Sequence, residues 1–333
     1  MYTPFRFVLL GASLLLACFA QRPTVTAADQ LLSGPGPTFR FSDNQLSSPL
    51  TLILYGDQRF TDPANTRATD PRVRELLVMR IAAEHPTAVI LNGDVVLNGS
   101  NKDDYTVYRT ETRAWRDAHV LVFPALGNHE FHGDPHTCLE NWWKAFPKLR
   151  NRRWYSAQLG SRIYLLALDS DTSLLPGSVQ ATWIQQQLAS LPATIEFVIV
   201  TMHHPPVADV QQNIGMSHNP RPNEIALRDY LAKTAHTSRA VFLVSAGHIH
   251  NYERTIYQGT IYLVSGGGGA KPYYVERTPE DLYKSNLFPN YHYVKLTLEK
   301  NRLHGAMFRV SNPEAAKLDL EKKDTFDLTA KSD

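Results

Sequence analysis

Five short segments of the chain combine residue types that bind metal ions. They read Gly56-Asp57, Asn92-Gly93-Asp94, Gly127-Asn128-His129-Glu130, His203-His204-Pro205-Pro206 and Gly247-His248-Ile249-His250. Imidazole and carboxylate groups suit Zn, Fe and Mn ions, and glycine beside a ligand lets the backbone come close to an ion. A Gly-Asp pair alone is usually a turn, but the five segments together predict a metal centre. They hold too many ligands for one tetrahedral zinc, so two ions that share a carboxylate fit better.

Each of these segments directly follows an apolar run. The runs cover residues 50–55, 87–91, 119–123, 195–201 and 239–245, and two further runs cover 162–168 and 260–265. Near-continuous apolar runs of this length are typical of strands that are covered on both faces. Because ligands bind at the carboxyl ends of strands in open α/β sheets, we expect the five segments to meet at one edge.

Helices are predicted between the strands. Asp70-Pro71 is an N-cap followed by proline at the first helical position, and further helical patterns cover residues 179–192 and 222–235. Residues 291–310 alternate on both sides of a polar turn, which predicts a hairpin. The pattern indicates one α/β domain over residues 48–312. We expect a linker at 21–47 and a charged C-terminal tail at 313–333.

The N-terminus predicts export. Residues 1–20 contain one arginine and then an apolar stretch that ends in small residues, as a signal peptide does. Two cleavage sites compete: one would leave a lipidated Cys18 at the mature N-terminus, and the other follows Ala20. Only Cys138 lies beyond this segment, so the exported protein would have no internal disulfide. We expect a periplasmic or extracellular protein, with contact to a membrane only through a lipid on Cys18.

Composition limits the classes of partner. The chain is 43% hydrophobic and 20% charged, as is ordinary for a globular protein, and its formal net charge is only +2. A nucleic-acid-binding protein would carry a clear excess of basic residues. We therefore expect no nucleic-acid partner, and the sequence leaves the oligomeric state open.

The ordered set of segments resembles the calcineurin-like metallophosphoesterases. The stretches "HHPP", "GHIHNYER" and "YLVSGGGGA" are most similar to the purple acid phosphatases of that superfamily. The resemblance covers roughly residues 50–270 and implies two packed mixed β-sheets flanked by helices, a four-layer sandwich. It also implies two divalent or trivalent ions (Mn, Fe or Zn) and a bridging hydroxide that attacks phosphorus.

The resemblance also implies roles for single residues. Six of them would be metal ligands: Asp57 and His250 for the first ion, Asn128, His203 and His248 for the second, and Asp94 as the bridge. His129 would contact the phosphate and protonate the leaving oxygen, which is general-acid work. His204 would lie behind the ligands or face the substrate, and Glu130 would orient a ligand or cap a turn.

Two positions depart from the family pattern. Most relatives have a histidine ligand two residues after the first aspartate, where this chain has Arg59, and purple acid phosphatases have a tyrosine at the position of Leu97. The first ion would therefore be the weaker one, and no purple colour is expected. An arginine side chain stays protonated and has no free lone pair, so it cannot bind a metal ion. Arg59 would either form a bidentate pair with a site carboxylate or contact the substrate phosphate, and we favour the second role.

The sequence thus predicts a dinuclear metal-dependent phosphatase that hydrolyses phosphate monoesters. One alternative is a phosphodiesterase that acts on nucleotides or lipid head groups. Another, of a different class, is a degenerate protein that binds metal or phosphate without catalysis, which the reduced first-ion site would explain. The physiological substrate stays open, because specificity depends on the loops between the segments.

Overall fold

Two mixed β-sheets form the centre of the molecule in a computed structural model, which describes residues 36–209 and 218–332. The seven-stranded sheet runs in the order β1 (Phe39–Phe41), β5 (Tyr155–Leu159), β6 (Ile163–Ala167), β7 (Phe197–Thr201), β8 (Val241–Ala246), β10 (Thr260–Ser265) and β9 (Tyr252–Tyr257). The six-stranded sheet runs in the order β13 (Leu320–Thr329), β12 (Arg302–Val310), β11 (His292–Glu299), β2 (Thr51–Tyr55), β3 (Ala88–Leu91) and β4 (Leu121–Pro124).

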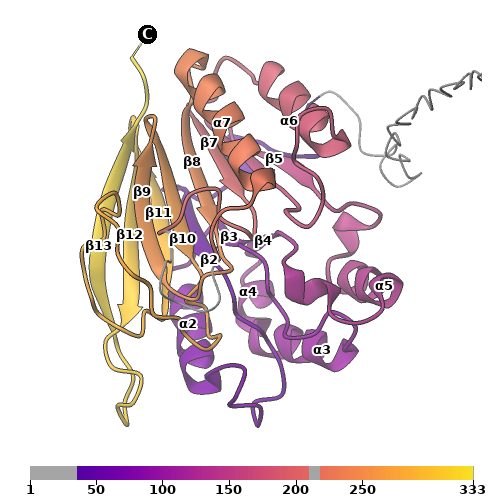
Figure 1. Ribbon diagram of the computed structural model, residues 1–333, viewed down its shortest axis with the longest axis vertical. Coiled ribbons are helices and arrows are strands. Elements are labelled where there is room, and N and C mark those ends of the chain that lie inside the picture. Colours follow the sequence, from indigo (N-terminus) through magenta and orange to yellow (C-terminus); the bar gives the residue numbers. More distant parts are fainter. Residues whose placement is uncertain (1–35, 210–217, 333) are drawn as a thin grey trace, which may run out of the picture.

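Helices flank both sheets, which confirms the predicted sandwich. The described α-helices are α2 (Pro71–Ala83), α3 (Lys102–Glu111), α4 (Arg113–Asp117), α5 (Pro135–Ala145), α6 (Val179–Ala189) and α7 (Pro222–Thr237). Figure 1 shows α6 and α7 together beside the seven-stranded sheet, with β11, β12 and β13 on the opposite side of the molecule. The helix α2 contacts β11 and α4. Short 3-10 helices cover Asp43–Gln45, Asn128–Phe131 and Pro147–Leu149.

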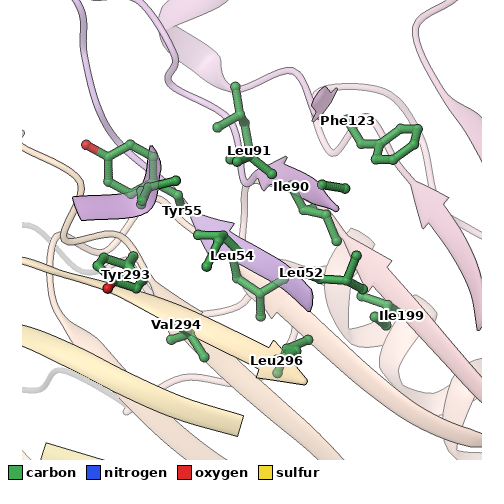
Figure 2. Packing of buried hydrophobic residues seen from close by; sticks show 14 of the residues in the cluster. Leu52, Leu54, Tyr55, Ile90, Leu91, Phe123, Ile199, Tyr293, Val294 and Leu296 are labelled. Atoms are coloured by element: carbon green, nitrogen blue, oxygen red, sulfur yellow. The ribbon is translucent and has the colours of Figure 1, made fainter. Parts of the chain in front are cut away.

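Strand β7 shows why the apolar runs are continuous. Phe197 and Ile199 belong to the core that includes the six-stranded sheet, whereas Val198 and Val200 pack in the second core, with residues of α6 and α7. Successive side chains of a strand point to opposite faces, so a strand between two layers needs apolar residues at every position. Figure 2 shows the first core, in which Ile199 lies near Leu52 of β2.

Most predicted elements are present, and the domain is longer than predicted. All seven apolar runs form strands, the hairpin is β11 and β12, and Asp70 caps α2 by accepting hydrogen bonds from the backbone nitrogens of Arg72 and Val73. Two boundaries need correction. Strand β1 lies within the predicted linker at 21–47, and β13 lies within the predicted tail at 313–333, so both segments contribute a strand to a sheet. Strand β13 pairs with β12 along its length, but only two of its side chains, Phe326 and Leu328, are buried. Their neighbours in the strand are polar or charged. In the sequence that pattern resembles a polar tail.

The N-terminal predictions lie outside the described residues. The signal peptide at 1–20, the lipid on Cys18 and most of the linker precede residue 36 and stay predictions. Cys138 is buried and unpaired. Within the two described ranges, no helix is both long enough and apolar enough to cross a bilayer.

Candidate metal centre

The carboxyl ends of strands from both sheets meet at the predicted site. Strands β2, β3 and β4 pair in parallel in one sheet, and β7 and β8 pair in parallel in the other. Asn92, at the end of β3, joins the two: its amide nitrogen donates to Ser245 Oγ of β8 over 2.9 Å, and its amide oxygen accepts from Thr201 Oγ1 of β7 over 2.9 Å. The sequence marked Asn92 only as a neighbour of Gly93 and Asp94. Its role depends on partners that are distant in sequence.

Four ligand atoms converge around His203, and we call this cluster position two. Its Nδ1 lies 3.0 Å from the Asn92 carbonyl oxygen, which can only accept, so Nδ1 carries the proton and Nε2 has a free lone pair. That Nε2 lies 3.0 Å from Asn128 Oδ1, 3.2 Å from Asp94 Oδ1 and 3.3 Å from His248 Nδ1. Atoms that bind one ion at about 2.1 Å lie roughly 3.0 to 3.4 Å apart. Position two therefore has the spacing of a metal site.

Asp57 and His250 form a second cluster, which we call position one. Asp57 Oδ1 and His250 Nε2 lie 3.4 Å apart, both are buried, and neither has a hydrogen-bond partner among the described residues. The other atom of each group is occupied: Asp57 Oδ2 accepts from the backbone nitrogen of His248 over 2.9 Å, and His250 Nδ1 donates to the carbonyl oxygen of Lys271. Two buried, unpaired electron-pair donors side by side are costly unless a cation lies between them.

Asp94 connects the two positions. Its Oδ1 faces His203 in position two, and its Oδ2 points away toward Arg59 and His129. The carboxylate is fully buried and also accepts a hydrogen bond from the backbone nitrogen of His129 over 3.0 Å. Burial alone would raise the pKa of Asp94, but the neighbouring His203, His129 and Arg59 lower it overall. Ligand atoms of Asp57, Asp94 and His203 lie within 4.8 Å of one another, so Asp94 is close to both positions.

Glu130 holds the turns that carry these ligands. Its buried carboxylate accepts hydrogen bonds from three backbone nitrogens: Gly127 over 2.7 Å, Asp94 over 3.0 Å and Val96 over 3.1 Å. These bonds tie the loop after β3 to the loop after β4. Glu130 thus binds the backbone of both turns, and its role in orienting a metal ligand stays a prediction.

His129 lies beside the centre with one nitrogen fixed. Its Nδ1 donates to the carbonyl oxygen of Leu97 over 2.6 Å, and its Nε2 lies 3.8 Å from Asp94 Oδ2. The side chain is 12% exposed, so it reaches the edge of the site. Burial lowers the pKa of His129 to about 4, although Asp94 raises it. The ring is therefore neutral at pH 7, with a free Nε2 toward the centre.

Arg59 contacts the bridging carboxylate. Its Nη2 and Nε lie 3.0 and 3.3 Å from the same oxygen, Asp94 Oδ2. Of the two predicted placements, the structure shows the pair with a carboxylate, although through one oxygen and not through both. Burial raises the pKa of the nearby Tyr273 hydroxyl, and the Arg59 charge opposes that rise. Contact with a substrate phosphate stays a prediction.

Comparisons with known proteins agree with this geometry. The model of the calcineurin-like phosphoesterase family matches residues 51–252. The chain belongs to this family. A probable purple acid phosphatase of Arabidopsis thaliana is 27% identical over 161 residues, which are 43% of this chain and 36% of that protein.

Solved structures of phosphatases share the fold of this phosphoesterase. A purple acid phosphatase from yellow lupin (Lupinus luteus) seeds has a TM-score of 0.68 and 19% identity, over 86% of this chain and 55% of the lupin chain. A dimetal phosphatase from Danio rerio has a TM-score of 0.53 and 16% identity, over 86% of this chain and all of the other. The chain thus spans about half of the lupin enzyme and about a third of the Arabidopsis protein.

The side chains of this calcineurin-like phosphoesterase suit bound metal ions. Burial lowers the pKa of both His203 and His250, so both rings are neutral at pH 7, the form that binds ions. Burial and then the Asp94 carboxylate raise the pKa of Asp57 well above its ordinary value. Each of these shifts comes mainly from burial, which disfavours the charged form of a side chain. A bound cation would favour the ionised Asp57 carboxylate and would take up the free lone pairs of the neutral histidine rings.

Three residues near the centre were missed or only partly predicted. His218 Nδ1 lies 3.0 Å from His248 Nε2, and the Tyr273 ring stacks on both His218 and His250. Neither His218 nor Tyr273 follows a strand in a recognisable motif, so no spacing in the sequence marked them. His204 has a ring nitrogen close to those of His203 and His248, while its Nδ1 bonds Ser170 Oγ over 2.8 Å. It thus lies beside the predicted ligands of position two.

Proposed function

We propose that this calcineurin-like phosphoesterase is a metal-dependent phosphatase that hydrolyses phosphate monoesters. The observation that carries the proposal is the pair of ligand clusters that share Asp94. Asp57 and His250 would hold one ion, Asn128, His203 and His248 the other, and Asp94 both. Bound ions of this kind supply an activated water and neutralise the negative charge that develops on a phosphoryl group.

The protein's own groups would orient the ester and supply a proton. His129 is the group placed for this, because the Leu97 carbonyl fixes its ring and leaves Nε2 facing the centre from the site edge. A phosphate dianion next to Nε2 would favour the protonated ring. From there His129 would donate to the leaving oxygen, a contribution typically worth about 100-fold or more in rate.

Leaving groups of different basicity test the role of His129. We expect His129→Ala to lower kcat/KM for phenyl phosphate by about 100-fold or more, and to lower it much less for p-nitrophenyl phosphate, because p-nitrophenolate leaves without a proton. His136→Ala, at an exposed histidine in the first turn of α5, is the control and should change neither. An equal loss on both esters would contradict the leaving-group role.

The choice between monoesters and diesters is measured directly. The proposal expects a higher kcat/KM for p-nitrophenyl phosphate than for its bis-ester with the same metal. The reverse order would favour the phosphodiesterase alternative. Failure to hydrolyse either ester with Mn, Zn, Fe or Co would favour a protein that binds without catalysis.

A further inference from the structure

Arg59 contacts the carboxylate that the two ion positions would share. Asp94 Oδ1 faces position two, whereas Asp94 Oδ2 accepts both guanidinium contacts, at 3.0 and 3.3 Å. A bridging carboxylate would offer that Oδ2 to an ion in position one. The guanidinium of Arg59, which stays positively charged, therefore pairs with one of the few atoms that could bind an ion in position one.

The backbone and its neighbours hold Arg59 in this place. Its φ angle is 47°, in the left-handed region, and its backbone nitrogen donates to the Asp94 carbonyl oxygen over 3.0 Å. Its own carbonyl oxygen accepts from Arg74 Nη1 over 3.3 Å, and its side chain is only 13% exposed. Arg59 is thus built into the wall of position one.

The two positions consequently differ in what they offer an ion. Position two has four converging ligand atoms. Position one has Asp57 Oδ1 and His250 Nε2, because Asp57 Oδ2 is bonded to the backbone of His248 and Asp94 Oδ2 to Arg59. An ion in position one would also lie close to the guanidinium, and two buried cations repel each other unless an anion lies between them.

We propose that Arg59 couples the filling of position one to the binding of a phosphate group. Without an anion, position one binds its ion weakly and position two is filled first. A phosphate between the ion and the guanidinium removes the repulsion and offers oxygens to both, so phosphate and the ion in position one bind cooperatively. The inference rests on the proposed function, since it assumes the ion positions of that site. Because such coupling is reciprocal, the ion must also tighten phosphate by the same factor.

Counting bound ions tests this coupling without any turnover. The ion-free protein is titrated with Mn²⁺ in the presence and absence of inorganic phosphate, and free Mn²⁺ is followed by electron paramagnetic resonance. For the wild type we expect one tightly bound ion, and a second whose affinity rises about 5-fold or more with phosphate. Two ions of equal affinity without phosphate would overturn the proposal.

Substitutions at position 59 separate charge from other effects. Arg59→Met keeps an unbranched apolar stem without charge, and should strengthen the second ion in the absence of phosphate and reduce its phosphate dependence. Arg59→Lys retains a cation and should behave as the wild type does. Arg80→Met, in an exposed ion pair with Asp319, is the control for loss of an arginine. An unchanged second-ion affinity in Arg59→Met, with the first ion still bound, would contradict the role of the charge.

A variant with an added ligand gives an independent check. Arg59→His places an imidazole where most relatives have one, and should bind two ions tightly even without phosphate. If Arg59→Met does not fold, the comparison of Arg59→His with Arg59→Lys decides the question in the same way, and equal ion binding by these two variants would overturn the proposal. Ester hydrolysis is assayed separately, so a protein that shows the coupling but no hydrolysis would refute the proposed function and leave the coupling standing.

Discussion

Glu130 shows how one buried side chain sets the geometry of this site. Its two carboxylate oxygens accept three backbone hydrogen bonds, from residues of two different strand ends. Burial raises the pKa of Glu130 well above its ordinary value, and the negative charge of Asp94 raises it further. The backbone donors oppose that rise. A glutamate that touches no substrate can therefore control where Asp94 and Asn128 lie.

The amide variant of Glu130 tests this control. Glu130→Gln replaces one accepting oxygen by an NH₂ group that cannot accept, so at least one backbone nitrogen loses its partner. We expect the affinity of the tighter ion to fall by about 10- to 100-fold, as is typical for groups that orient ligands. Glu84→Gln, whose carboxylate pairs with Lys295 far along the chain, is the control. Equal ion affinity in both variants would contradict the orienting role.

Among single residues, the sequence predicted the candidate ligands better than the residues that surround them. Residue types and spacing marked all six predicted ligands, and the structure brings them together in one site, although their binding of ions stays a prediction. Asn92, His218 and Tyr273 were not marked. Their roles come from contacts between segments that are distant in sequence, such as His218 with His248, and such contacts leave no local pattern.

The turns after the strands are the elements that aim the ligands. Asp57, Asp94 and His248 have φ angles of 58°, 51° and 69°, although none is glycine. Left-handed backbone is uncommon in such residues and concentrates at functional sites. Glycines beside them provide the space: a Cβ at Gly127 would overlap the Asp94 carboxylate and its backbone nitrogen. The turns are thus close-packed around the ligands.

Gly127→Ala tests this packing. Gly127 has a φ of −117°, which alanine tolerates, so the added methyl group acts through overlap with its neighbours alone. We expect a loss of about 1–3 kcal/mol in unfolding free energy together with weakened binding of both ions. Calorimetric ion titration and urea unfolding measure the two effects.

Gly259→Ala is the matched control for this substitution. It has a φ of 80° with open space around it, so it should cost about 1 kcal/mol in stability and leave ion affinity unchanged. A Gly127→Ala protein that binds ions as the wild type does would contradict the packing account.

Most strands that are buried on both faces were predicted, whereas the edge strands β1 and β13 were not. Strands such as β2 and β7 are apolar at nearly every position, a pattern that few structures besides a doubly covered strand produce. Strands β1 and β13 lie at sheet edges, where one face meets solvent and charged residues interrupt the pattern. Strand β1 also pairs with β5, which is distant in sequence, so a local pattern cannot reveal that partner.

At the scale of the whole molecule, polar contacts join the two sheets in addition to their shared apolar core. Besides Asn92, His292 of β11 connects to Ser265 of β10, with its Nε2 3.0 Å from Ser265 Oγ and its Nδ1 2.8 Å from the Asn290 carbonyl oxygen. The carbonyl can only accept, so Nδ1 holds the proton and Nε2 accepts from the serine. A second proton on this ring would require Ser265 Oγ to accept instead of donate, and would place a positive charge on a fully buried side chain.

His292 therefore predicts a loss of stability in acid. Burial lowers the pKa of His292 to about 4, whereas the unfolded chain has the ordinary value of about 6.5. The unfolded state thus takes up a proton first, so stability is complete above about pH 6.5 and falls as the pH drops below it. Between pH 7.5 and 5 the loss is about 2 kcal/mol.

Urea unfolding of His292→Gln measures this contribution. Glutamine can bond both partners but does not titrate, so the variant should lose about 2 kcal/mol less than the wild type between pH 7.5 and 5. Both proteins are kept free of metal ions, so that the other histidines contribute equally. The same pH dependence in the two proteins would contradict the assignment to His292.

Metal-dependent hydrolysis of a phosphate monoester tests the central claim most directly. The protein is stripped of metal, reconstituted in turn with Mn, Zn, Fe or Co, and assayed on p-nitrophenyl phosphate beside Asp94→Asn, which removes the charge of the bridging carboxylate. The account predicts no hydrolysis without metal, hydrolysis restored by at least one ion, and a loss of about 100-fold or more in Asp94→Asn. Hydrolysis that persists without metal, or that Asp94→Asn retains in full, would contradict it.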